Sequence, residues 1–216
     1  YTKIDDYADE YLPYPDFIPT GSADINYFNV KVNSAVDSLI FKIKMTRISD
    51  YTRLGFSLFN QISGKYGSQI TDLNIHTIDW SDQGMFLILA NPNSKYYDST
   101  KQNILYLSSN PVTKGKRINV QITGQNEFIF SIACTDIDGI LGNYNDKRYF
   151  SLYSFLCDES GAEYKSAITG ALANQPYVYD FAFAPKFKQN IILNNHNEAR
   201  YSRLDAENRG IAGVLP

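Results

Sequence analysis

The sequence predicts an all-β fold: a β-sandwich (jelly-roll-like, with about ten strands) that carries an extended arm at each terminus. Apolar and polar residues alternate along several segments, which places every second side chain on the same face of a sheet. Turn-forming residues separate these segments at intervals typical of sandwiches. No segment has the spacing of a long amphipathic helix, although residues 163–172 could form one or two helical turns.

The predicted strands follow one another closely along the chain. One group alternates and comprises residues 28–32, 39–45, 118–122 and 177–183. A second group is apolar at successive positions, as in strands covered on both faces, and comprises residues 85–90, 104–107 and 128–133. The glycine-containing turn at 63–68 divides residues 54–62 from 70–78, and 123–126 has the composition of a hairpin loop.

The chain divides into one domain and two arms. A length of 216 residues is enough for a single large sandwich that folds without cross-links. Residues 1–20 are acidic, aromatic and interrupted by prolines, and residues 194–216 are polar and then small and apolar. We therefore expect the sandwich domain to span 21–193 between an N-terminal and a C-terminal arm.

Charge and hydropathy exclude two classes of partner. The net charge is −3 and no cluster of Lys and Arg interrupts it, so we expect no nucleic-acid partner. No apolar run approaches the roughly 20 residues that a membrane span needs. The chain starts at Tyr1 without an initiator Met or an apolar leader. This favours a mature extracellular or cell-surface protein whose signal peptide has been removed, although a trimmed chain would look the same.

The two cysteines leave their redox state open. An exported protein with Cys134 and Cys157 could form one disulfide, or the two residues could be buried thiols. If residues 127–134 and 148–157 formed a simple hairpin, its register would hold the two thiols well apart.

The sequence does not favour catalysis. Its histidines, His76 and His196, lie in a predicted strand and in the polar C-terminal arm, and no Gly-x-Ser-x-Gly motif is present. Two carboxylates suffice for glycoside hydrolysis, but the spacing of the 23 acidic residues selects no pair. We expect a protein that is not an enzyme.

Calcium is the inorganic ligand that the sequence favours most. Hard cations bind several oxygens that converge from loops. The two candidate clusters are Asp136, Asp138, Asn143, Asn145 and Asp146, in one predicted loop, and Asp5 and Asp6 with Asp9 and Glu10, in the N-terminal arm. For each cluster the alternative is that acidic loops simply keep the protein soluble.

Aromatic residues in predicted loops are the candidates for ligand binding. Tyr96, Tyr97 and Tyr144 lie outside the alternating segments. Their rings could stack on sugar rings, or they could pack against other loops or a neighbouring subunit.

The first thirty residues resemble a known domain opening. Tyr11-Leu12-Pro13-Tyr14-Pro15, then Phe17 and Gly21, then the segment from Asp24 to Val30 resemble the start of glucodextranase-like C-terminal domains, which belong to the DOMON-like β-sandwiches. Gly21 stands one place later than in that pattern, and the glycine-rich part of the acidic stretch is missing. The resemblance implies a sandwich with a non-catalytic role in binding or surface attachment.

Haem is a further ligand that this resemblance raises. Some DOMON-like domains bind haem through Met and His, and the chain has Met45, Met85 and His76. A Met on a strand usually fills the core, so we do not expect haem here.

Two functions remain open. The first is a structural protein that self-associates by β-strand addition into a surface filament or coat, with other copies of itself as partners. The arm residues that would fill a neighbour's pockets are Phe17, Ile18, Ile211, Val214 and Leu215. The alternative is a carbohydrate-binding module of a glycan-active or surface-layer protein, with cell-surface glycans as ligands. The apolar arms favour the first, because a linker would be polar.

Overall fold

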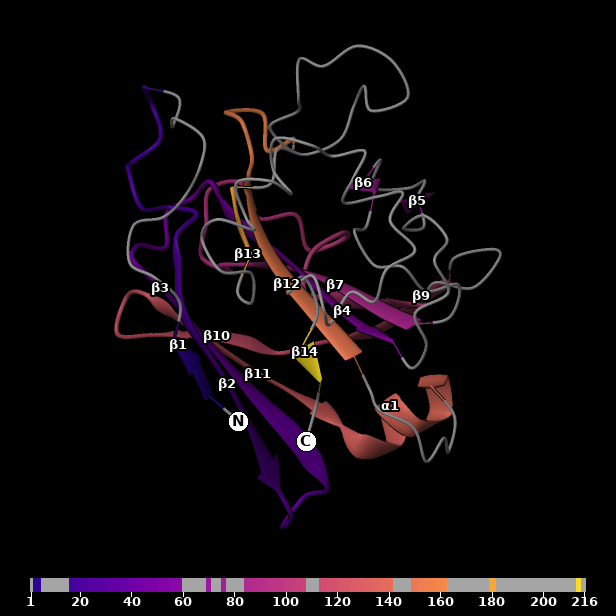
Figure 1. Cartoon of the computed structure of the whole chain (residues 1–216). Coiled ribbons are helices and arrows are strands. Elements are labelled where there is room, and N and C mark those ends of the chain that lie inside the picture. The colour runs from indigo at the N-terminus through magenta and orange to yellow at the C-terminus, as the bar shows by residue number, and fades with distance from the viewer. Residues whose placement is uncertain are drawn as a thin grey trace, which may run out of the picture.

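The computed structural model describes residues 2–4, 16–59, 69–70, 75–76, 84–107, 113–141, 149–162, 179–181 and 213–214. Within these residues, strands predominate and form two antiparallel sheets packed face to face (Figure 1). The predicted all-β sandwich is therefore confirmed.

The first layer, sheet A, has five strands in the order β1-β2-β3-β11-β10. They are β1 (Thr2–Ile4), β2 (Ile25–Asn33), β3 (Ser38–Met45), β10 (Val120–Thr123) and β11 (Glu127–Ala133). The hairpin predicted around 123–126 is present, since β10 and β11 pair directly with Thr123 opposite Glu127.

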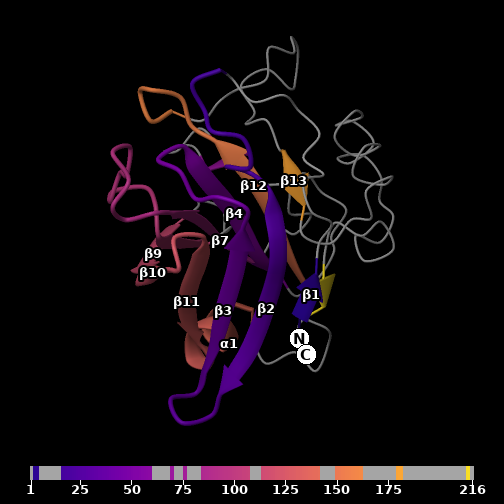
Figure 2. The ribbon, with the colours of Figure 1, turned by 90° about the vertical axis from the view of Figure 1, so that its left-hand side faces the viewer.

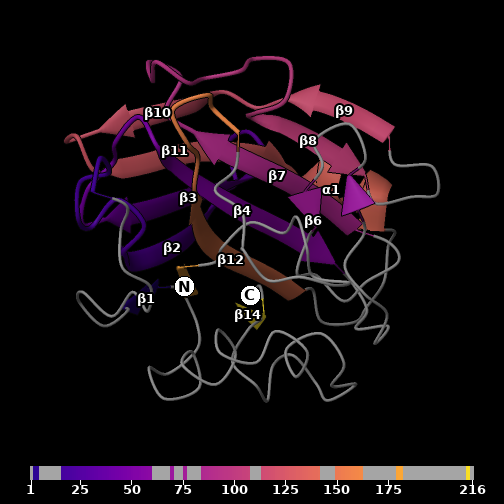
Figure 3. The ribbon, with the colours of Figure 1, turned by 90° about the horizontal axis from the view of Figure 1, so that it is seen from above.

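The second layer, sheet B, has the order β13-β12-β4-β7-β8-β9, and β14 pairs with β12. Its strands are β4 (Thr52–Phe59), β7 (Gly84–Ala90), β8 (Ile104–Leu107), β9 (Thr113–Arg117), β12 (Tyr149–Leu156), β13 (Asp180–Phe181) and β14 (Gly213–Val214). A separate short pair joins β5 (Gln69–Ile70) to β6 (Ile75–His76). Seen from above, β10 and β9 lie at one flank of the sandwich, and β1 and β14 lie at the other (Figure 3).

The chain passes repeatedly between the two sheets. β3 pairs with β11 in sheet A, while the strands that follow them, β4 and β12, pair in sheet B. The simple hairpin considered for 127–134 and 148–157 is therefore wrong. Between β11 and β12 lies the helix α1 (Cys134–Leu141), where a loop was expected. Ile137 is fully buried in the core, and this contact anchors the helix.

Phenylalanine rings join the two sheets at the centre of the core. Phe41 of β3 stacks on Phe130 of β11 with ring centroids 4.9 Å apart. Both rings meet Phe56 of β4 edge-on, at 5.0 and 5.6 Å. Such aromatic pairs add to the free energy gained from burying their area. The alternation read from the sequence is thus largely the pattern of inward-facing residues, and an exception is Val32, which is exposed near the end of β2.

Both terminal segments add strands to the sheets of their own chain. β1 pairs with β2 at the edge of sheet A, and β14 pairs with Tyr149 and Phe150 of β12 in sheet B. β1 and β14 lie on the same flank of the sandwich, each in a different sheet (Figure 2 and Figure 3). The terminal strands therefore cover the same open side of the sandwich.

Candidate functional site

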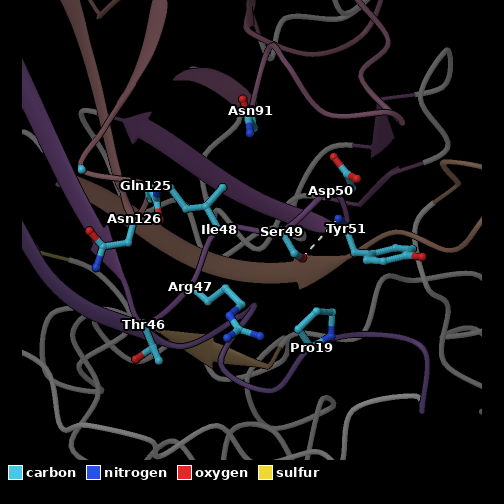
Figure 4. Close-up of a pocket in the computed structure, with 11 residues that line it drawn as sticks. Pro19, Thr46, Arg47, Ile48, Ser49, Asp50, Tyr51, Asn91, Gln125 and Asn126 are labelled. Atoms are coloured by element: carbon cyan, nitrogen blue, oxygen red, sulfur yellow. Dashed lines mark hydrogen bonds between the residues drawn. The ribbon is translucent and has the colours of Figure 1, made fainter.

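A polar pocket of about 590 Å³ lies at the end of the sandwich where β3 leaves sheet A (Figure 4). It is lined by Pro19, Thr46, Arg47, Ile48, Ser49, Asp50, Tyr51, Asn91, Gly124, Gln125 and Asn126. Carboxamides and hydroxyls dominate this lining, together with one guanidinium and one carboxylate. A pocket of this size can enclose a small ligand or the tip of a turn.

Two turns with unusual backbone angles shape the pocket. In the β10–β11 hairpin, Gly124 and Gln125 have φ values of 58° and 69°, a pair of left-handed residues that matches the twist of the strands. Gly21, two residues after the lining residue Pro19, has a φ of 80°, and a Cβ at this position would lie 2.7 Å from Cγ2 of the lining residue Thr46. Glycine adopts this backbone angle without strain and leaves the Thr46 side chain in place.

Arg53 connects the two loops beside the pocket. Its side chain is 1% exposed, and its guanidinium donates hydrogen bonds to the carbonyl oxygens of Asp50, Thr52 and Tyr96 at 3.1, 2.8 and 2.7 Å. A buried charge needs such partners, because losing its water shell is costly. The main chain at Tyr96 is thereby tied to the segment 46–51.

Two further bonds reinforce the same connection. The hydroxyl of Ser94 donates to the carbonyl oxygen of Asp50 at 2.8 Å, and the amide of Lys95 donates to Oδ1 of Asp50 at 3.0 Å. The loop that follows β7 is therefore held against the loop that precedes β4. These bonds form within the chain and need no ligand.

Three aromatic rings lie in a row beside the pocket, and we call them the aromatic ledge: Phe17, Tyr51 and Tyr96. Phe17 meets Tyr51 edge-on at 5.5 Å, and Tyr51 lies 5.2 Å from Tyr96. Nζ of Lys95 lies 4.9 Å from the centre of the Tyr96 ring. A hydrogen bond with Tyr96 raises the pKa of Tyr51 to about 12.

The structure places two of the three predicted ligand tyrosines at this end of the molecule. Tyr96 and Tyr97 lie in the connection between β7 and β8; Tyr96 belongs to the aromatic ledge, and the hydroxyl of Tyr97 accepts a hydrogen bond from Arg117 at 3.3 Å. Tyr144 lies outside the described residues. Tyr51 and Arg47 were not singled out from the sequence, because they are isolated residues between two strands and no motif marks them.

The predicted calcium cluster at 136–146 is only partly described. Asp136 lies in α1, not in the expected loop, and its carboxylate pairs with Nζ of Lys116 at 3.1 Å. Asp138 belongs to the same helix, while Asn143, Asn145 and Asp146, like Asp5 and Asp6, lie outside the described residues. In the part of the chain that is described, no three His, Cys, Asp or Glu side chains gather as a metal site would require.

The predicted arm residues divide into two groups. Ile18 is 4% exposed and packs in its own chain against Ala23, Leu156 and Tyr179, so it fills no neighbour's pocket while it stays there. Phe17 remains 43% exposed. Val214 forms part of β14, and Ile211 and Leu215 fall outside the described residues.

The cysteines, methionines and histidines considered from the sequence are the remaining candidates. Cys134 begins α1 and Cys157 follows β12, and both are thiols rather than a disulfide. The Cys157 thiol donates to the carbonyl oxygen of Asp50 at 3.8 Å. Met45 and Met85 are buried in the core. His76 lies in β6, and His196 is outside the described residues.

No family model matches the chain, and neither the curated proteins nor the solved structures contain a match to it. The likeness to glucodextranase-like C-terminal domains therefore stays a prediction. Among the described residues, no helix is both long and apolar enough to cross a membrane.

Proposed function

We propose that this chain is a non-catalytic, extracellular structural protein that self-associates by exchanging its terminal strands, and so builds a surface filament or coat. The observation that supports this most is that both terminal strands pair on one flank of the sandwich, β1 with β2 and β14 with β12. Both sheets accept an extended terminal segment there, and main-chain hydrogen bonds are the same whether the segment comes from the same chain or a neighbour.

The exchange is plausible energetically because the terminal pairings are short. β1 has three residues and β14 has two, so few hydrogen bonds hold either strand. Residues 5–15 connect β1 to the body and can reach up to about 35 Å when extended. A neighbour's sheet edge within that reach could accept the strand, since exchange of such an element between copies is a low-cost route to dimers.

Disulfide trapping between two different variants tests the exchange. Thr2 of β1 lies opposite Asn29 of β2 in the register. A chain with Thr2→Cys is mixed with a chain with Asn29→Cys, both in a Cys134→Ala background that retains the fully buried Cys157. Because the cysteines at positions 2 and 29 are on different chains, a disulfide between these two positions can form only between chains. We expect covalent dimers on a non-reducing gel.

The control moves the second cysteine out of register. Val32→Cys lies on the same strand as Asn29 but three residues further along, too far from Thr2 for a disulfide. If Thr2→Cys bonds with both partners equally slowly, the terminal strands do not exchange and the proposal fails. If the cross-link does form in register, light scattering and negative-stain microscopy of the unmodified chain show whether the assembly is a filament.

Binding of cell-surface glycans is a second candidate, and the aromatic ledge favours it. The rings of Tyr51 and Tyr96 are partly exposed and pack on each other, and Arg53 binds the main-chain oxygens of Asp50 and Tyr96 beside them. A rigid aromatic surface next to carboxamides and hydroxyls is suited to a sugar, which offers an apolar ring face and many hydroxyls. A glycan array probed with the unmodified chain and with Tyr96→Ala tests this candidate, and equal signals for both would reject the ledge as the site.

A further inference from the structure

The exposed apolar side chains of the described residues gather at two opposite ends of the sandwich. Val32 and Val36 are each 66% exposed, and Phe17 is 43% exposed. The two valines lie at the tip of the β2–β3 hairpin, which projects beyond the rest of the molecule (Figure 1). Phe17 lies at the other end, where its ring contacts Tyr51 of the pocket. We call these ends the hairpin pole and the pocket pole.

The strands themselves separate the two poles. β3 runs from Ser38, beside the hairpin tip, to Met45, next to the pocket residue Thr46. Eight residues of strand span about 25 Å. A surface at one pole therefore cannot reach the other pole of the same rigid sandwich.

The charges at the two poles are complementary. The hairpin tip carries the exposed Asp37, and the pocket carries the exposed Arg47. Within the described part of the chain, neither side chain takes part in an ion pair. A second pair is also complementary but has the signs reversed, since the positive Lys31 flanks the hairpin tip and the negative Asp50 lines the pocket.

We infer that the hairpin tip of one copy docks into the polar pocket of the next copy, with Val36 against Ile48 and Phe17, and Asp37 against Arg47. This inference rests on the proposed self-association and names a contact that strand exchange does not supply. The contact joins two different surfaces of the chain, so it is head-to-tail, and such contacts form open linear assemblies unless their rotation closes a ring. The repeat would run along the strands of sheet A.

Cross-linking between poles tests the contact directly. A chain with Val36→Cys is mixed with a chain with Ile48→Cys, again in the Cys134→Ala background. We expect a disulfide-linked dimer to form faster than in a mixture of Val36→Cys with Ser131→Cys. Ser131 is an exposed residue of β11 that lies opposite Ile40 of β3, several residues from the pocket pole, and serves as the matched control. Equal rates for the two mixtures would overturn the inference.

Charge reversal tests the pairing of Asp37 with Arg47. Arg47→Asp in the Ile48→Cys chain, or Asp37→Lys in the Val36→Cys chain, should slow the cross-link about fivefold, because like charges replace an exposed ion pair. Mixing the two reversed chains should restore the rate. Circular dichroism checks that each variant folds. Asp37 has a positive φ, which lysine adopts less readily than aspartate, so Asp37→Lys could fail to fold. Arg47 has no positive φ, and Arg47→Asp alone then tests the pairing. Rates that do not respond to either reversal would overturn this docking geometry.

The two assays separate the inference from the proposed function. Trapping of Thr2→Cys by Asn29→Cys without trapping between the poles would leave strand exchange standing and reject the pole contact. Trapping between the poles alone would show a head-to-tail contact without exchanged strands.

Discussion

Tyr27 and Glu127 form a hydrogen bond on the outer face of sheet A, across the intervening strand β3. The Tyr27 hydroxyl donates to Oε2 of Glu127 at 2.7 Å. This bond favours the protonated phenol and raises the pKa of Tyr27 to about 12. The folded pKa lies above the unfolded value of about 10, so the stabilisation is complete below pH 10 and is lost as the pH rises towards 12.

We predict that Glu127→Gln lowers the pKa of Tyr27 towards 10, since a neutral carboxamide accepts the hydrogen bond without opposing the phenolate. The measurement is a spectrophotometric titration of phenolate absorbance. Because the chain has 17 tyrosines, the signal of Tyr27 is taken as the difference from a Tyr27→Phe protein. A difference curve that Glu127→Gln leaves unchanged would show that the hydrogen bond is not the cause.

Arg53 provides the second prediction on single residues. We expect Arg53→Met to reduce the free energy of unfolding by about 3 kcal/mol, because three carbonyl oxygens lose a buried charged donor. Arg117→Met is the matched control: that arginine also donates hydrogen bonds but is exposed, and its loss should cost less than about 0.5 kcal/mol. Urea unfolding of both variants measures the difference. Similar values for the two would mean that burial of Arg53 adds nothing.

At the level of elements, alternation predicted the strands well but not their partners. The period of two in 28–32 and 39–45 is a local property, and both segments became paired strands of sheet A. Which strand lies beside which depends on contacts between distant residues, such as Phe41 with Phe130, and these leave no local pattern. The hairpin of 127–134 with 148–157 that was considered for the two cysteines is absent for the same reason.

The pocket could not be predicted for the same reason. Pro19, Asn91 and Gln125 lie far apart in the sequence and meet only through the order of the strands. None of them stands in a motif. Tyr96 was found because an aromatic residue inside a polar loop is locally conspicuous.

The helix α1 was missed because its sequence hardly favours it. It has eight residues, includes Gly139, and is shorter than isolated helices that are stable in water. We predict that Ile137→Ala lowers the free energy of unfolding by about 3 kcal/mol, since Ile137 is fully buried against the core. Ile122→Ala, at a partly buried site of β10, should cost clearly less. Thermal melting of both variants checks the ranking, and the reverse order would show that α1 is not held by its contact with the core.

At the scale of the whole molecule, the two flanks of the sandwich are not equivalent. β9, at one flank, reads Thr-Lys-Gly-Lys-Arg, and such charges discourage an edge from pairing with another chain. β1 and β14 cover the other flank. Strand addition is therefore expected at the flank covered by the termini and disfavoured at β9.

This asymmetry predicts that removal of residues 1–15 creates a binding site for the missing segment. The deletion keeps Ile18, which is buried against Leu156 and Tyr179 of its own chain, and leaves the edge of β2 unpaired. A labelled peptide of residues 1–15 should bind the truncated protein, whereas the full chain, whose edge is already occupied, should bind it at least about tenfold more weakly. Fluorescence anisotropy measures both affinities, with a scrambled peptide as control. Equal binding of the two peptides would mean that β2 offers no specific edge, and the termini would then have to associate by some other surface.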